Sequence, residues 1–316
     1  MWQSRHKALP LLWTGIVCLL QAPASWGQSC CGPPLLSLSG TERGVSPGTA
    51  LTLTLAYRFM RFAHTVNGTT TIPDPLGRTG FSHLWRVEAE VTPFPQWAFL
   101  LSLPFVAKGR TLRVDTLTAT DNAAGIGDVF FLLKRDISPA AWQSSWNIAL
   151  GAGIKAPTGA FNRERNGVRL PRDLQPGTGT WEALGWAFLG FFPSESEFTL
   201  ASSLLFRSPL QADELGYRNG IEFQALLSGT WITCPLPFLL PHGALRLRMT
   251  TADKLNGIPF SATGGYWLDA LPALTLLAPP FALQLQGTIP LLRHTRGPQL
   301  VHSWGIAADI SWSPLP

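Results

Sequence analysis

The fold is decided by an alternating stretch at residues 51–62, which reads LTLTLAYRFMRF. Successive side chains of a β-strand point to opposite faces, so residues 51, 53, 55, 57 and 59 form one apolar face. The opposite face carries two threonines, an alanine and Arg58. This stretch therefore predicts a strand with one apolar and one mixed face, which is the pattern of a membrane β-strand.

Comparable segments recur along the rest of the chain. They are residues 84–91, 96–106, 127–135, 145–155, 180–192, 197–207, 218–231, 244–250, 260–271, 273–288 and 300–312. Thirty glycines and 27 prolines exclude a mostly helical protein, because both residues interrupt helices. With residues 51–62 included, the sequence predicts an all-β protein of about 12 strands.

The connections between these segments alternate in length. Long polar links are expected at residues 63–83, 107–126, 156–179, 208–217, 251–259 and 289–299. Most of the other links are tight and contain proline, Pro272 among them; residues 232–243 form a long apolar exception. This alternation predicts an up-and-down antiparallel transmembrane β-barrel. A soluble β-sandwich is the alternative, but its outward face should be polar, whereas here the uniform face is apolar.

The N-terminus has the features of a secretory signal. Basic residues at positions 5–7 precede an apolar run at residues 8–20 and small residues that offer cleavage after Ala24 or Gly27. We therefore expect a signal peptide at residues 1–27, a periplasmic segment at residues 28–47 and a barrel at residues 48–316. The expected location is the bacterial outer membrane.

Charge and motif patterns exclude several classes of function. Loss of residues 1–27 would leave a net charge of only +3, and no segment clusters Lys and Arg among aromatic residues, so no nucleic-acid binding is expected. Ser303 follows His302 directly, so on a strand the two side chains face opposite sides. No nucleophile elbow occurs either. The sequence predicts that the protein is neither an enzyme nor dependent on a cofactor.

The mixed faces of the strands supply the candidate site, a polar lumen. Its predicted lining residues are Arg58, Arg86, Glu88, Glu90, Asp128, Lys155, Glu222, Gln224, Arg246, Arg248, Gln284 and Asp309. Both charge signs are present, so these residues are expected to pair with one another rather than to select strongly for one ion. Asp128 is expected either to cap a turn or to pair with a lumen cation. Tryptophans near the strand ends, Trp267 among them, are expected to form interfacial belts.

The cysteines allow several readings. Cys30 and Cys31 are adjacent, and Cys234 is far away in the sequence. The vicinal thiols could hold a soft metal ion, or one of them could pair with Cys234. Cys30 could also be a lipidated N-terminus, or the cysteines could be incidental. These alternatives stay open at the level of sequence.

Three stretches resemble signatures of one outer-membrane family. They are GIGD at residues 125–128, ALGAGIKAPTG at residues 149–159 and QPGTGTW at residues 175–181. They are similar to blocks of the transporter-like barrels named for the meta-pathway of phenol degradation. The chain departs from such barrels at its end, Trp312-Ser-Pro-Leu-Pro316, where an aromatic residue is usual.

The resemblance implies a channel or transporter for small, aromatic or hydrophobic organic compounds. Its expected partners are outer-membrane lipid, the barrel-assembly machinery and a small-molecule solute. Two other hypotheses are a barrel-anchored metal-binding or redox-linked surface protein that uses Cys30-Cys31, and a structural barrel with an occluded lumen. Whether the lumen is open or plugged by residues 28–50 is left to the structure.

Overall fold

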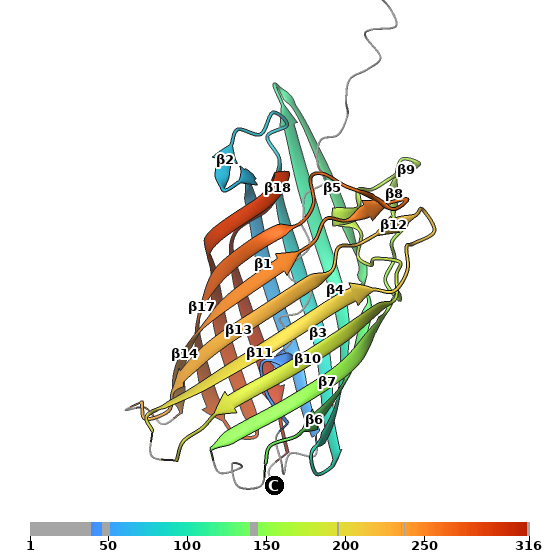
Figure 1. The fold of residues 1–316 in the computed structure, drawn as a ribbon. Coiled ribbons are helices and arrows are strands. Elements are labelled where there is room, and N and C mark those ends of the chain that lie inside the picture. Colours follow the sequence, from blue (N-terminus) through green and yellow to red (C-terminus); the bar gives the residue numbers. More distant parts are fainter. Residues whose placement is uncertain are drawn as a thin grey trace, which may run out of the picture.

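A closed antiparallel barrel makes up most of the computed structural model, which describes residues 39–45, 51–139, 145–194, 196–234, 236 and 238–314 (Figure 1). Within these residues, eleven strand elements form the wall. They are β1 (Leu51–Gly68), β3 (Thr79–Phe94), β4 (Trp97–Val114), β6 (Val129–Asp136), β7 (Trp146–Ala156), β10 (Glu182–Phe191), β11 (Phe198–Pro209), β13 (Glu222–Trp231), β14 (Leu239–Thr250), β17 (Gly265–Ala278) and β18 (Phe281–Trp312). Pairing of β18 with β1 closes the sheet.

The last element, β18, crosses the wall twice. It pairs antiparallel with β17 up to Thr295 and antiparallel with β1 from Thr295 onward. Every neighbouring pair in the ring is antiparallel, and such a ring needs an even number of crossings. The chain therefore reverses inside β18, where Gly297 has a φ of 75° that favours glycine. A Cβ added at Gly305 would lie 3.4 Å from the Thr288 Cβ, which places the two halves side by side. The barrel has twelve crossings, as the sequence predicted.

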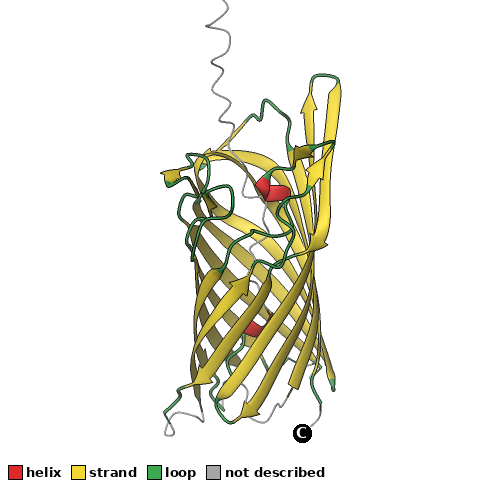
Figure 2. Cartoon of the chain, turned by 90° about the vertical axis from the view of Figure 1, so that its right-hand side faces the viewer, coloured by secondary structure: helices red, strands yellow, loops and turns green. Residues whose placement is uncertain are grey.

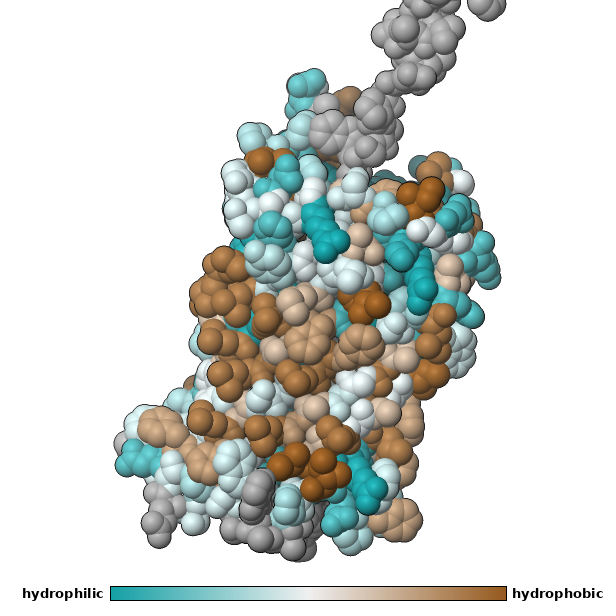
Figure 3. All heavy atoms as spheres, in the orientation of Figure 1, coloured by the Kyte–Doolittle hydropathy of each residue, from teal (hydrophilic) through white to brown (hydrophobic). Residues whose placement is uncertain are grey.

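The outer wall is apolar and the inner wall is polar. Along β4, for example, Leu103 is 46% exposed, and its neighbour Ser102 is fully buried. Apolar side chains gather in a broad band around the middle of the barrel, with polar residues concentrated toward its ends (Figure 3). In the described part of the chain, no helix has the length and apolar character needed to cross a bilayer. An open sheet edge has no hydrogen-bond partners in hydrocarbon, and closure removes that edge. The sandwich alternative is excluded, and the chain is an outer-membrane β-barrel.

An arginine placed on this band should destabilise the protein. We expect Leu103→Arg to cost about 2–4 kcal/mol of unfolding free energy, because a charge near the bilayer midplane loses its hydration. The measurement is a urea titration in lipid vesicles. Leu117→Arg is the matched control, since Leu117 is 76% exposed at the tip of a hairpin beyond the band. Equal effects of the two substitutions would contradict a lipid-facing wall.

Long connections lie at one end of the barrel, which we call the loop end; tight connections and the C-terminus lie at the other, the turn end (Figure 1). The loops carry the short elements β2 (Thr70–Ile72), β8 (Glu164–Arg165), β9 (Val168–Arg169), β12 (Tyr217–Arg218), β15 (Lys254–Leu255), β16 (Ile258–Pro259) and the 3₁₀ turn η2 (Arg172–Leu174). The alternation predicted from the sequence is present.

Residues 107–126, predicted to be a loop, are instead mostly strand. β4 continues to Val114 and pairs with β5 (Leu117–Ile126), so that a hairpin rises above the barrel (Figure 2). A tight turn at Asp115, with φ of 51°, reverses the chain. Thr118 and Thr120 are β-branched and suit a strand, even where the polarity of the segment resembles that of a loop.

The predicted turn at Pro272 was also wrong. Pro272 lies inside β17, and the chain reverses at Pro279-Pro280. The ladder between β17 and β18 passes from Ala270↔Ile289 directly to Ala273↔Gln286, so the missing N–H of Pro272 falls in an interrupted part of the ladder. Gly287 lies opposite the proline ring there, and a Cβ added to it would be in van der Waals contact with Pro272 Cγ at 3.4 Å.

Candidate functional site: the barrel lumen

The predicted lining residues all belong to the inward-facing set of the wall and its loops. Nine are buried: Arg58, Arg86, Glu88, Asp128, Lys155, Glu222, Gln224, Arg246 and Arg248. Glu90, Gln284 and Asp309 are half-buried. Because alternate residues of each strand point inward, the mixed faces of different strands converge on one interior.

A chain of ion pairs runs along the inner wall near the loop end of the lumen, at the ends of four strands. Lys155 Nζ lies 2.8 Å from Glu182 Oε1, and Arg207 Nη1 lies 3.1 Å from Glu182 Oε2. Arg207 Nη2 is 3.0 Å from Glu222 Oε2, and Gln224 donates to Glu222 at 2.7 Å. These residues occupy adjacent positions on β7, β10, β11 and β13, so the register of the sheet assembles the chain.

A second cluster lies across β14, β17 and β18. Arg246 Nη2 is 2.8 Å from Asp269 Oδ2, and His302 Nε2 is 2.8 Å from Asp269 Oδ1. The sequence analysis missed Asp269, His302, Glu182 and Arg207 as lumen residues. The signal was available, because each lies in a predicted strand and charged residues on such strands face inward.

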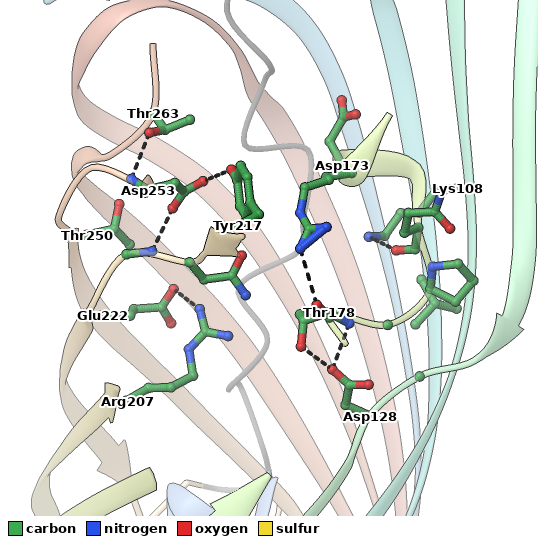
Figure 4. A pocket seen from close by; sticks show the side chains of 18 of the residues that line it. Lys108, Asp128, Asp173, Thr178, Arg207, Tyr217, Glu222, Thr250, Asp253 and Thr263 are labelled. Atoms are coloured by element: carbon green, nitrogen blue, oxygen red, sulfur yellow. Dashed lines mark hydrogen bonds and ion pairs between the residues drawn. The ribbon is translucent and has the colours of Figure 1, made fainter. Parts of the chain in front are cut away.

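The loop end of the lumen contains a cavity of about 160 Å³, which we call the outer cavity (Figure 4). Polar side chains line it from several directions, including Lys108 of β4, Arg207 of β11 and Glu222 of β13. The connection between β7 and β10 folds inward and contributes Asp173 and Thr178. The cavity is thus built by the barrel wall and by an ordered loop that covers it.

Asp128 anchors this inward fold. Its Oδ2 accepts hydrogen bonds from Thr178 N at 2.9 Å and Thr178 Oγ1 at 2.6 Å, and lies 2.8 Å from Lys155 Nζ. Its Oδ1 accepts from Gly159 N at 3.0 Å. Gly159 and Gly177 are packed so closely that a Cβ on Gly177 would overlap the Gly159 carbonyl. The three sequence stretches that resemble the family signatures therefore meet at one carboxylate.

Neutralising Asp128 should release the loop. We expect Asp128→Asn to expose residues 160–178 to trypsin at the loop arginines, because hydrogen bonds to a charged acceptor contribute about 1.5–3 kcal/mol each. Limited proteolysis of the folded protein in detergent measures this. Asp121→Asn is the control, since Asp121 pairs with an exposed arginine, Arg165, and such surface pairs contribute less than about 1 kcal/mol. A loop that stays resistant in Asp128→Asn would contradict the anchoring role.

Two further loop contacts close the outer cavity from above. Arg172 binds Asp213, and its Cζ lies 4.1 Å from the centre of the Tyr217 ring. The Tyr217 hydroxyl donates to Asp253, which also accepts from Gly220 N at 2.6 Å. Burial raises the pKa of Asp253 and lowers that of Arg172, although Asp213 opposes the latter shift. Burial thus disfavours the charged form of both groups.

The turn end of the lumen contains an N-terminal segment, residues 39–45, which includes the 3₁₀ turn η1 (Ser39–Thr41) (Figure 2). Inward-facing side chains hold its main chain. Trp186 Nε1 donates to Thr41 O at 3.0 Å, Asn147 Nδ2 to Val45 O at 3.1 Å and Lys134 Nζ to Arg43 O at 3.2 Å. We call residues 39–45 the inner segment.

The inner segment divides the lumen. Below it, toward the turn end, lies an inner cavity of about 860 Å³ that Glu42, Arg43 and wall residues such as Phe192 line. Beside Thr41 and Glu42 lies a much smaller space of about 20 Å³, next to Gln224 and Arg246. The outer and inner cavities are therefore separated by a narrow section made of the inner segment and the ion pairs.

The structure gives limited information on the metal hypothesis. Cys30 and Cys31 lie outside the described residues, as does the predicted signal peptide. Cys234 has no disulfide partner in the described part of the chain. Among the residues that the structure describes, no three His, Cys, Asp or Glu side chains gather as they would around a metal ion.

The family follows from a comparison of the sequence with family models. The model described as "Putative MetA-pathway of phenol degradation" matches residues 39–290, which include all but the last of the barrel strands. The chain belongs to this family. Among curated proteins, none matches the sequence.

Solved structures of similar fold are outer-membrane barrels. The COG4313 outer membrane channel from Pseudomonas putida F1 has a TM-score of 0.65 and 13% identity, with 85% of this chain and 97% of that chain covered. The NanC porin has a TM-score of 0.44 and 9% identity, with 84% and 100% covered. OprD from Pseudomonas aeruginosa has a TM-score of 0.37 and 8% identity, with 86% and 95% covered. The likeness to the P. putida channel agrees with the barrel architecture of this member of the family.

Proposed function

We propose that the protein is an outer-membrane channel for small organic compounds and not an enzyme. The observation that carries this proposal is the pair of cavities, of about 160 and 860 Å³, that occupy opposite ends of one polar lumen. A solute entering from the loop end would meet the outer cavity first and leave through the inner cavity. The family's description and the printed name of the P. putida channel support the same function.

The dimensions of the lumen favour small solutes. Twelve strands enclose more space than eight, whose interior is filled or holds one ligand, and less than the 16–18 strands of open porins. Lumen charges of both signs are paired with one another, so the wall does not impose a strong preference between cations and anions along its whole length.

Purified protein in planar lipid bilayers tests the proposal. We expect small discrete current steps in salt and swelling of protein-containing liposomes in a single-ring organic solute, with slower swelling in a disaccharide. A protein that is folded, as judged by faster migration of the unheated sample on a denaturing gel, yet gives neither current nor swelling would contradict the channel.

The structural barrel is the second candidate, and one observation favours it. Between the two cavities, the inner segment lies against the wall beside a space of only about 20 Å³ that Gln224 and Arg246 line. A permanently closed lumen predicts no conductance in the full chain and none after removal of the inner segment. A channel predicts conductance in at least the second case, so the two functions give different results.

A further inference from the structure

Four basic residues line the outer cavity, and they differ in whether neighbouring polar groups bind them. Three of the four are neutralised or saturated by neighbours: Lys108 Nζ donates to Gln175 O at 2.9 Å, Arg172 binds Asp213, and Arg207 binds Glu182 and Glu222. A buried cation ordinarily requires such partners, because burial removes its hydration.

The fourth is Arg248 on β14. It lines the outer cavity and is 7% exposed, yet among the described residues it has no hydrogen bond and no ion pair. Its guanidinium stacks on the indole of Trp267, with Cζ 4.2 Å from the ring centre. Stacking holds one face of the guanidinium and leaves its N–H edge free to bind a ligand.

Trp267 itself was predicted to lie in an interfacial belt, and the structure contradicts that prediction. The residue is 1% exposed and faces inward beside Arg248 in the register of β14 and β17. Because Trp267 lies on the inward face of β17, its indole contacts the guanidinium of Arg248 and not lipid.

None of the four acids that line the cavity forms an ion pair with Arg248. Asp128 pairs with Lys155 at 2.8 Å, Asp173 with Arg110 at 3.3 Å and Glu222 with Arg207 at 3.0 Å. The fourth, Asp253, accepts from the Tyr217 hydroxyl and from Gly220 N. Arg248 is therefore the one arginine of the cavity lining that has no ion pair among the described residues, since Arg172 and Arg207 each bind a carboxylate.

We propose that Arg248 is the receptor for the carboxylate of a small organic acid that binds in the outer cavity. A carboxylate matches the N–H edge of a guanidinium with two parallel hydrogen bonds and supplies the ion pair that Arg248 lacks. Tyr217, Pro104, Val106 and Pro176 line the same cavity and offer apolar contacts to the rest of the molecule. A volume of about 160 Å³ lies below the usual 300–1,000 Å³ of sites for drug-sized ligands, which indicates an acid of a single ring.

The inference names the solute class of the proposed channel, but binding does not require conduction. Isothermal titration calorimetry of the full-length protein in detergent therefore tests it separately, with benzoate, its neutral analogue benzamide and inorganic phosphate as probes. We expect benzoate to bind more tightly than either of the others. Replacing Arg248 by glutamine should weaken benzoate binding by roughly ten- to a hundredfold, the loss expected for hydrogen bonds to a charged group.

Arg135→Gln is the matched control. Arg135 also stacks on a tryptophan, Trp97, with Cζ 5.0 Å from the ring centre, but it is exposed on the outside of the wall. We expect this variant to bind benzoate as the unaltered protein does. Gel mobility of unheated samples shows whether both variants are folded.

The outcomes separate the two proposals. Equal binding of benzoate and benzamide, or unchanged benzoate binding in Arg248→Gln, would overturn the carboxylate site. Phosphate binding as tight as that of benzoate would overturn the organic part of the assignment. Benzoate binding that depends on Arg248 in a protein without conductance would support the site and count against the channel.

Discussion

Deletion of residues 39–45 is expected to raise the single-channel conductance several-fold. The inner segment lies between the two cavities, and the space that it lines together with Gln224 and Arg246 is only about 20 Å³. Its removal would join the inner cavity of about 860 Å³ to the middle of the lumen. Current through a pore is limited by its narrowest section, so widening that section has the largest effect available in this barrel. Planar bilayer recordings of the deleted and full-length proteins measure it.

The barrel holds the inner segment mainly through main-chain contacts. Trp186, Asn147 and Lys134 donate to its carbonyl groups, and Gly40 N donates to Glu88 Oε2 at 3.3 Å. Val45 adds one apolar anchor in a buried cluster of the lumen. Hydrogen bonds between neutral groups contribute about 0.5–1.5 kcal/mol each in net terms, and those to a charged group such as Lys134 contribute about 1.5–3 kcal/mol. Deletion of the segment is therefore a more direct test than its spontaneous displacement.

A reversible disulfide between the inner segment and the barrel wall provides a control in which no residue is deleted. A Cβ on Gly44 would overlap the Asn147 amide oxygen, so cysteines at positions 44 and 147 lie within the reach of a disulfide. In a background with the natural cysteines replaced by serine, oxidation of Gly44→Cys/Asn147→Cys should hold conductance at its lowest level, and reduction should restore it. Conductance that is the same with the segment deleted, cross-linked or free would rule out a plug.

The barrel was predictable because its signal is distributed over many strands. Alternation at residues 51–62 is repeated with the same polarity around the ring, and a one-residue shift in register would place Arg58 in lipid. The predictions were wrong where one residue type occurs in two kinds of local structure. Pro272 was interpreted as a turn, although a proline also fits within a strand where the ladder is interrupted.

The lumen was predictable only in part. Charged residues on mixed faces were recognised, but the unpaired state of Arg248 depends on which carboxylates the register brings near it. The position of the inner segment left no sequence signal, because Lys134, Trp186 and Asn147 bind carbonyl groups that any residue would supply. Asp128 was expected to serve a turn or a lumen cation, and it contacts both the loop and Lys155.

Replacement of Lys155 by methionine is expected to be the most destabilising single substitution discussed for this chain. Lys155 is fully buried, and its Nζ lies 2.8 Å from both Asp128 Oδ2 and Glu182 Oε1. Methionine fills a similar volume but leaves both carboxylates with less positive charge around them. Removing one member of a buried ion-pair network costs about 3–5 kcal/mol, because the remaining charges are already desolvated. Urea titration in lipid vesicles, followed by tryptophan fluorescence, measures the loss.

A second substitution shows whether the stability lost in Lys155→Met comes from the missing charge or from altered packing. Lys155 is the ion-pair partner of Asp128, whereas Glu182 also binds Arg207. Asp128→Asn in the Lys155→Met background therefore removes the carboxylate left without a cation, so part of the lost stability should return if charge is the cause; a packing defect would not be relieved. Arg165→Met is the control for loss of a cation from a loop-end pair, with an expected cost below about 1 kcal/mol because the Arg165–Asp121 pair is solvated. If Lys155→Met unfolds at the same urea concentration as Arg165→Met, the buried ion pairs of Lys155 do not stabilise the barrel.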